Sequence, residues 1–285
     1  MRIALVGAGR VGVAVASLLR DAGHDIAGVA SRSPSSAGQA AARLGTETLP
    51  FDGVGSIDAD LVLIGVTDDA IEKTAIDIAP RVGPEALVAH FAGSLGPSAL
   101  GPLGVPPRGC ALHPVQACPD VDTAIRRLPG SAWGVTAPEG PTHISIHALI
   151  TDDLHGHPVD VDEAVRPLWH AAAVTTSNGI AALLATGESI MASIGIVSPE
   201  TVLGPLAAGT VANAAEGGGG SATLTGPVVR GEAATIARHL SALRAQSPEL
   251  AKAYTDTVRM IAASAALTGR ISEDIRAQIE EVLRP

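Results

Sequence analysis

The stretch Ile3 to Gly12, IALVGAGRVG, decides the fold. It opens with a short apolar run, and such a run in front of a glycine-rich turn is typical of a buried strand. The turn has the spacing Gly-x-Gly-x-x-Gly, at Gly7, Gly9 and Gly12, and a segment with helical periodicity follows it. A strand, this turn and a helix in succession predict the start of a doubly wound domain that binds a dinucleotide.

Each glycine of the turn has a physical role in that motif. Gly7 permits the tight turn, Gly9 lets the backbone approach a pyrophosphate, and Gly12 lets the helix pack closely on the strand. The N-terminus of the helix adds unpaired N–H groups and positive potential, and both favour a phosphate. We therefore expect the whole turn to contact the cofactor, through Gly7, Ala8, Gly9, Arg10, Val11 and Gly12.

The residues after the second predicted strand indicate which dinucleotide is bound. Domains that bind NAD place an acidic residue about 20 positions after the last glycine, where it accepts a hydrogen bond from the ribose. Here the chain has Ser31, Arg32 and Ser33 instead. Serine hydroxyls can donate to a phosphate and a guanidinium can pair with it, so we expect NADP as the cofactor. The alternative is that Arg32 is only a solvent-exposed loop charge.

The rest of the first half alternates between strand-like and helix-like segments. Strands that alternate with helices predict a parallel sheet with helices on both faces. We expect this α/β domain, a doubly wound Rossmann-type parallel sheet, to cover residues 1–162. Its further strands are expected within residues 26–30, 60–66, 86–91, 110–112, 133–136 and 158–161.

The second half has the character of helix throughout. No strong helix breaker follows Pro167 up to residue 194. Two later segments, 198–200 and 247–249, have the sequence Ser-Pro-Glu, which combines a capping serine, a proline and an acid in the order typical of a helix start. We expect an all-helical C-terminal domain over residues 163–285.

Composition excludes several classes of partner. The net charge of −10 opposes binding to a polyphosphate, and with 2% aromatic residues few rings remain for base stacking, so we expect no nucleic-acid partner. No apolar run approaches the ~20 residues of a membrane span, and because MRIALVGAGR leads directly into the glycine motif we expect no signal peptide. The two cysteines, Cys110 and Cys118, are most simply reduced thiols. We expect a cytoplasmic protein that acts on a small molecule.

Polar residues gather at the predicted carboxyl ends of strands, where open α/β sheets bind their ligands. Val66 and Thr67 follow one strand, and Thr67 either faces the nicotinamide or caps the next helix. The segments HFAGS (90–94) and HPVQ (113–116) follow two others, and WHAAAVTTSN (169–178) lies on the first long helix. These three segments supply five candidate catalytic residues: Ser94, His113, Gln116, His170 and Asn178.

These five residues are candidates because they suit the reduction of a carbonyl or imine by hydride transfer. The reaction needs a donor for the charge that grows on the heteroatom; histidine can also transfer a proton, whereas asparagine can only polarise. His170 and Asn178 are eight residues apart, ~12 Å along a helix, so they cannot hold the same small oxygen. We expect Ser94 and Gln116 to line the pocket. For His113, a hydrogen bond to the backbone at its strand end is an equal alternative.

Four histidines, His143, His147, His155 and His157, occur close together. The first two have the i, i+4 spacing of one helix face. No cysteine and no tight chelating motif accompanies them, and the segment has the character of a solvent-facing helix and turn. We therefore expect no metal site.

The chain resembles the 6-phosphogluconate dehydrogenase-like superfamily, and within it the Rossmann-like family that carries domain of unknown function 2520. The resemblance implies a nicotinamide-dependent oxidoreductase, with the substrate between two domains and catalytic groups on the long helix. It also implies a homodimer formed through the helical domain. It covers nearly the whole chain and rests on GAGRVG (7–12), HFAGS (90–94), HPVQ (113–116), WHAAAVTTSN (169–178) and TGPVVRGE (225–232).

One position departs from these relatives. Many hydroxy-acid relatives carry lysine four residues before the helix asparagine, where this chain has Val174. His170 or His113 must then supply the proton, while Asn178 orients the substrate and Arg230 either binds its carboxylate or caps a helix. We expect an NADPH-dependent reductase of a small 2-oxo acid, with ketopantoate as the first candidate. The alternatives are a cyclic imine reductase of the pyrroline-carboxylate reductase type and a non-catalytic NADP-binding regulator.

Overall fold

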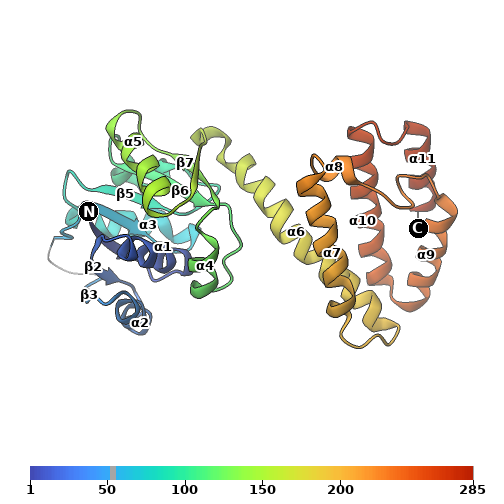
Figure 1. Cartoon of the computed structure of the whole chain (residues 1–285), viewed down its shortest axis with the longest axis horizontal. Helices are drawn as coiled ribbons and strands as arrows, with labels where there is room; N and C mark the ends of the chain where they lie inside the picture. Colours follow the sequence, from blue (N-terminus) through green and yellow to red (C-terminus); the bar gives the residue numbers. More distant parts are fainter. Residues whose placement is uncertain (52–55, 285) are drawn as a thin grey trace. The chain divides into compact units, whose positions relative to one another are not determined.

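The computed structural model describes residues 1–51 and 56–284 (Figure 1). The chain divides into two compact units, Met1–Val174 and Thr175–Pro285. The division falls within helix α6 (Arg166–Ser193), which belongs to both units. The boundary expected after residue 162 stays a prediction.

The first unit is built on an eight-stranded sheet with the order β3-β2-β1-β4-β5-β6-β7-β8. Neighbouring strands run parallel except for β6 and β7, which are antiparallel. This confirms the predicted doubly wound sheet, in which the chain crosses from β3 back to β4, beside β1. The strands are β1 (Arg2–Val6), β2 (Asp25–Ala30), β3 (Thr48–Leu49), β4 (Leu61–Ile64), β5 (Leu87–His90), β6 (Gly109–Pro114), β7 (Ala132–Thr136) and β8 (His157–Asp160).

Both faces of this sheet are covered by helices, as strand β1 shows. Ile3 and Leu5 belong to one buried cluster with α1, α2, α4 and α5, whereas Ala4 and Val6 belong to a second cluster with α3. Alternate strand residues face opposite sides, so a strand covered on both faces is apolar throughout. The helices of the unit are α1 (Arg10–Asp21), α2 (Pro34–Leu44), α3 (Ile71–Ile78), α4 (Val121–Arg127) and α5 (Pro141–Ala148).

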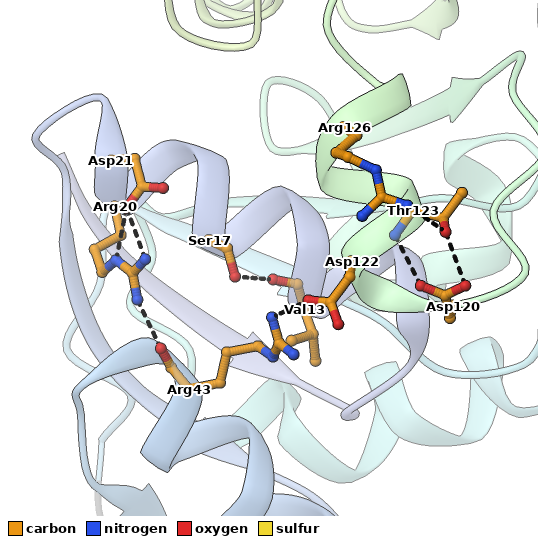
Figure 2. A network of polar contacts seen from close by, with 9 residues as sticks. All are labelled: Val13, Ser17, Arg20, Asp21, Arg43, Asp120, Asp122, Thr123 and Arg126. Atoms are coloured by element: carbon orange, nitrogen blue, oxygen red, sulfur yellow. Dashed lines mark hydrogen bonds and ion pairs between the residues drawn. The ribbon is translucent and has the colours of Figure 1, made fainter.

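Polar side chains tie three of these helices together (Figure 2). Arg43 on α2 pairs with Asp122 on α4 at 2.7 Å, and the backbone carbonyl of Arg43 accepts from the guanidinium of Arg20 on α1 at 2.7 Å. Asp120 caps α4 by accepting from the N–H of Thr123 at 2.7 Å. Exposed ion pairs contribute only about 0–1 kcal/mol each, so the apolar cluster beneath them contributes most to holding the helices in place.

Every described element of the second unit is helical, which confirms the predicted helical C-terminal region. Its core joins α9, α10 and α11 through buried residues such as Ile236, Val258 and Ile279. None of the described helices combines the length and the apolar character that a membrane crossing needs. Beyond α6 the helices are α7 (Pro199–Glu216), α8 (Gly220–Thr223), α9 (Ala233–Gln246), α10 (Pro248–Leu267) and α11 (Glu273–Val282).

The two Ser-Pro-Glu segments both start helices, but by different means. Ser247 caps α10 by accepting from the N–H of Leu250 at 3.2 Å. Ser198 instead has a left-handed backbone, with φ of 56°, and its side chain makes no capping hydrogen bond. Helix α7 nevertheless begins at Pro199, because proline at the first position has the φ of a helix and no N–H to satisfy.

Candidate active site

The glycine-rich turn lies where β1 meets β4, at the carboxyl edge of the sheet. Gly7 has a φ of +92°, a conformation that favours glycine, and its N–H donates to the carbonyl of Ala30 at 2.7 Å. The N–H of Gly9 donates to the carbonyl of Gly65 at 2.8 Å, and a Cβ on Gly9 would collide with that same oxygen. Packing of the protein itself therefore requires glycine at position 9, before any cofactor is considered.

Gly12 and Gly65 pack against each other at the start of α1. A Cβ on Gly12 would lie 3.0 Å from the Cα of Gly65, and a Cβ on Gly65 would lie 2.8 Å from the carbonyl oxygen of Gly7. The turn after β1 and the turn after β4 therefore interlock through glycine. Sequence analysis did not single out Gly65, although a glycine inside the apolar run 60–66 is typical of a close backbone approach.

A cavity of about 460 Å³ opens beside this turn, within the first unit. Its volume is in the range of small-molecule sites. The expected cofactor residues Ser31, Arg32, Val66 and Thr67 line it together with the whole turn 7–12. The structure thus gathers these separate segments around one cavity.

Ser33 is the expected cofactor residue that lies outside this lining. Its hydroxyl caps helix α2 by accepting from the N–H of Ser36 at 3.2 Å, and Ser36 lines the cavity instead. Serine is a favoured N-cap residue, and Ser33 directly precedes Pro34, the first residue of α2. Arg32 lines the cavity and has no hydrogen bond or ion pair to any of the residues that the structure describes.

Thr67 occupies the N-cap position of a short 3-10 helix, Asp68–Ala70, yet its side chain makes no capping hydrogen bond there. It is exposed and lines the cavity with Val66. Of the two roles considered for Thr67, this geometry favours the one toward a ligand. Asp68 and Cys118 also line the cavity, and neither was expected from the sequence.

The cavity fits the phosphates of a dinucleotide on the protein's own geometry. Gly9 is the N-cap of α1 and has no side chain to bond the first N–H groups of that helix. These groups, with the positive end of the helix, are suited to an anion. Near the end of β2 the lining offers Ser31, Arg32 and Ser36, two hydroxyls and a cation without a carboxylate among the described residues of that segment.

Two of the expected catalytic residues, His113 and His170, lie against each other. His113 is near the end of β6 and His170 is in the second turn of α6; their ring centroids are 5.4 Å apart, with the planes at 87°. The indole N–H of Trp169 donates to Nδ1 of His113 at 3.0 Å. Because an indole nitrogen only donates, Nδ1 of His113 is an acceptor, and the proton of the neutral imidazole lies on Nε2.

The loop after β5 connects this histidine pair to the cavity. Ala92 lines the cavity, and the next residue, Gly93, packs against both imidazoles. A Cβ on Gly93 would lie 2.9 Å from Nε2 of His113 and would collide with the ring of His170. The absence of a side chain at position 93 therefore makes room for the pair.

His113 is held in its neutral form. Burial, with smaller effects from His170 and Arg166, lowers the pKa of His113 to about 4. At physiological pH its Nε2–H is then a hydrogen-bond donor that polarises an oxygen without transferring a proton, as neutral histidines do in some other active sites.

Arg166, at the start of α6, is fully buried beside this pair. Its guanidinium donates to the carbonyl of Ala92 at 2.9 Å and to the hydroxyl of Thr136 at 2.8 Å. Its Nε has no partner among the described residues. Burial lowers the pKa of Arg166 to about 10, and Glu163 opposes this change, so the guanidinium remains charged at neutral pH.

His90, the first residue of HFAGS, has a structural role. It is fully buried, its Nε2 donates to the carbonyl of Gly96 at 3.0 Å, and its Nδ1 accepts from the N–H of Ala92 at 3.2 Å. Burial lowers the pKa of His90 to about 4. This neutral histidine fixes the conformation of the loop that carries Gly93.

The other expected catalytic residues have different surroundings. Gln116 is exposed, and its amide donates to a backbone carbonyl at the end of α4 at 3.4 Å. Ser94 is half-buried in the loop after β5, and Asn178 is exposed in the part of α6 that belongs to the second unit. Arg230 forms an ion pair with Glu232 at 2.6 Å. The catalytic roles of these residues stay predictions.

Sequence analysis missed Arg166 and Gly134. The indole of Trp169 packs over Gly134 on β7, where a Cβ would lie 2.7 Å from the indole nitrogen. A glycine inside an apolar strand was the available signal, because such a residue often marks the close approach of another group. Arg166 gave no comparable signal, since an arginine at a helix start is usually exposed.

Comparison with known domains agrees with this architecture. Residues 1–114 match the model of the Rossmann-like domain, and residues 131–261 match that of the domain of unknown function DUF2520. Both parts of the expected domain pair are confirmed. A search of curated proteins gave no match.

Solved structures with the same fold include several oxidoreductases. A Bacteroides fragilis protein assigned to the NADP oxidoreductases is 24% identical, with a TM-score of 0.75 over 92% of this chain and 98% of its own. A reductive aminase from Aspergillus terreus, solved with NADPH and ethyl-5-oxohexanoate, is 18% identical, with a TM-score of 0.62 over 98% of both chains. A pyrroline-5-carboxylate reductase from Coxiella burnetii is 16% identical, with a TM-score of 0.58 over 91% of this chain and 97% of its own.

Proposed function

We propose that the protein is an NADPH-dependent reductase of a small carbonyl compound, with 2-oxo acids as the first substrate class. The observation that carries the proposal is the loop after β5, since Ala92 lines the cavity beside the glycine-rich turn and Gly93 packs against both His113 and His170. Consecutive residues of one loop thus contact the candidate cofactor cavity and the pair of polar, titratable side chains. Structural neighbours named as oxidoreductases support the same reading.

The cofactor would be held by residues already in place around the cavity. The turn 7–12 would bind the pyrophosphate, and Ser31, Arg32 and Ser36 would bind the phosphate on the adenosine ribose. Val66 and Thr67 would line the nicotinamide end. When bound, the dinucleotide supplies the hydride.

The two histidines would have different roles toward the substrate. His113, neutral and with its proton on Nε2, would donate a hydrogen bond to the substrate oxygen and polarise it. His170 would supply the proton that this oxygen needs when the carbon takes up hydride. The chain lacks the lysine of many relatives at Val174, so a histidine acid in the preceding turn of α6 would replace it.

The buried charge of Arg166 favours an anionic substrate. Its guanidinium lies near His113, where positive potential attracts a carboxylate and opposes a cation. This supports a 2-oxo acid, and ketopantoate remains the first compound to test. Arg230 is less suited to bind the carboxylate, because Glu232 already pairs with it.

A cyclic imine is the second candidate substrate. The name of the Coxiella burnetii neighbour, a pyrroline-5-carboxylate reductase, favours it. A protonated imine is cationic, however, and would lie close to Arg166. The third candidate is a non-catalytic NADP-binding regulator. Such a protein needs no proton donor, so this hypothesis does not account for the contact between His113 and His170.

Oxidation of NADPH, followed by absorbance, distinguishes these readings. The protein is incubated with NADPH and a panel of 2-oxo acids, including ketopantoate, and in parallel with cyclic imines. We expect turnover with a 2-oxo acid and a loss of about a hundredfold or more in His170→Ala, with NADPH affinity retained. Turnover of imines alone would replace the substrate class. Tight NADPH binding without any turnover would favour the regulator.

We further propose that the chain forms a homodimer through its helical unit. Val202, Leu206 and Val211 on α7 are 51%, 67% and 47% exposed, and Leu267 at the end of α10 is 89% exposed. Exposed apolar surface on this scale is more typical of an interface than of a monomer. Light scattering should give twice the chain mass for the protein and for a control, Asn213→Asp, but a shift toward monomer for Leu206→Asp. A monomeric unaltered chain would exclude the dimer.

A further inference from the structure

His143, His147 and Asp160 form a compact cluster away from the cofactor cavity. The two histidines lie one turn apart on α5, with ring centroids 4.0 Å apart, and Asp160 is the last residue of β8. Oδ1 of Asp160 accepts from Nε2 of His143 at 2.8 Å and from Nε2 of His147 at 2.9 Å. Three groups able to bind a metal therefore converge with their ligand atoms within 4.8 Å of one another.

The four histidines, considered without other ligands, predicted no metal site. Two of the four, His155 and His157, do not belong to this cluster. The third member is a carboxylate 13 residues beyond His147, brought next to α5 by the pairing of β8 with β7. The cluster depends on this tertiary contact, so spacing along the chain does not reveal it.

The chemistry of the three groups matches a zinc-type ion. Two imidazole nitrogens and one carboxylate oxygen are ligands that Zn²⁺ accepts, and three protein ligands leave a fourth position for water. Magnesium and calcium prefer oxygen ligands and suit this set less well. On binding, each neutral imidazole would carry its proton on Nδ1, so that Nε2 is free to bind the metal in place of the hydrogen bond to Asp160.

The cluster is accessible to solvent and lies between an edge strand and a helix. The side chains of His143, His147 and Asp160 are 33%, 27% and 64% exposed, so an ion from solvent can reach them. β8 is an edge strand of the sheet, and among the described strands it pairs with β7 alone. A metal bound here would join this edge strand to α5.

We propose that His143, His147 and Asp160 bind one divalent transition ion of the zinc class, which clips the edge strand β8 to helix α5. The role proposed for the ion is to hold β8 on α5, and this role is independent of the proposed reductase activity. Because the ion binds the folded arrangement, it raises the stability of the first unit.

Titration of the full chain, prepared without a polyhistidine tag, with Zn²⁺ alone tests this proposal. Calorimetry should give one site per chain, and thermal unfolding should shift to higher temperature with Zn²⁺. His147→Gln and Asp160→Asn each remove one ligand and should weaken binding at least about tenfold. The matched control, His155→Gln with His157→Gln, removes two neighbouring histidines outside the cluster and should bind Zn²⁺ like the unaltered chain.

Three results would overturn the proposal. The first is no saturable Zn²⁺ binding by the unaltered chain; the three residues would then be only a hydrogen-bonded cluster. The second is equal binding by His147→Gln and the unaltered chain. The third is loss of binding in the double control, which would place the ion at His155 or His157. Circular dichroism of each variant checks that the fold is retained, so that weaker binding reports on the ligands.

Discussion

The indole nitrogen of Trp169 donates to Nδ1 of His113 across 3.0 Å, and this single contact fixes the tautomer of the histidine. Trp169 is held in turn by Gly134, which leaves space for its ring over β7. The direction in which His113 can donate is thus set by a residue on α6 and a gap on a neighbouring strand. Such support is what a hydrogen-bond donor needs to act on a substrate without reorganising.

Replacement of Trp169 by Phe should therefore lower kcat while leaving NADPH binding unchanged. Phenylalanine keeps much of the packing over Gly134 but removes the N–H, so that the proton of His113 can move to Nδ1 and away from the substrate. A loss of roughly tenfold to a hundredfold is expected, somewhat less than the loss of an oxyanion donor itself. An unchanged kcat in Trp169→Phe would show that this hydrogen bond does not matter to the reaction.

A methyl group at position 93 should disturb the histidine pair directly. In Gly93→Ala the new Cβ would meet His113 and His170, and we expect a loss of about 1–3 kcal/mol in the free energy of unfolding, together with a loss of activity. Gly38→Ala on α2 is the matched control, because nothing lies within 4 Å of its Cβ position. That substitution should be neutral or stabilising. Urea unfolding of both variants measures the difference.

Removal of the guanidinium of Arg32 should change the choice between the two dinucleotides. Arg32→Ala should weaken NADPH binding by about tenfold to a hundredfold, the worth of a charge-assisted hydrogen bond, and leave NADH binding nearly unchanged. Arg126→Ala, which removes an exposed arginine on α4 outside the cavity, serves as the control. Fluorescence titration with both cofactors checks this. Equal losses for NADPH and NADH would exclude contact with the ribose phosphate.

Acid should destabilise the first unit between about pH 6.5 and pH 4. His90 and His113 have pKa values lowered to about 4 in the folded chain, so the unfolded chain binds more protons than the folded chain in this range. The contribution of each histidine to the free energy of unfolding is therefore fully present above its pKa in the unfolded chain. This contribution is lost as the pH falls toward the folded pKa, by up to on the order of 3 kcal/mol for each histidine.

Urea unfolding at a series of pH values tests this effect. His113→Gln should show a smaller loss of stability on acidification than the unaltered chain, because one of the two buried imidazoles is gone. His155→Gln, which removes an exposed histidine, should retain the full loss. The same slope in all three proteins would assign the acid sensitivity to other groups.

The fold could be predicted from the sequence because its main signals are local. The glycine spacing at Gly7, Gly9 and Gly12 determines one turn, and continuous apolar strands require cover on both faces. The antiparallel pairing of β7 with β6 was not predicted, because an apolar strand has no mark for its direction. Two roles were open to the hydroxyl of Ser33, contact with the cofactor and capping of α2. We predicted the first from the sequence, whereas in the structure the hydroxyl caps α2.

The candidate site could be predicted only in part, because its contacts are tertiary. The segments at 90–94, 113–116 and 169–178 were each chosen for their residue types, and that reasoning could not show that Gly93, His113 and His170 touch while Gln116 is turned toward α4. The buried state of Arg166 likewise depends on the ends of strands far apart in sequence. Residue type selected the candidates, whereas the tertiary fold determines which of them lie together.

Gly65 has a consequence for how the protein can change over evolutionary time. Its carbonyl accepts a hydrogen bond from the N–H of Gly9, and its backbone packs so closely on Gly7 and Gly12 that neither of them can carry a side chain. A Cβ added at any one of these four positions meets a backbone atom of another of them, and no change of side chain at that second glycine can remove its backbone. Among homologous sequences, these four glycines should therefore be inherited or lost as a group.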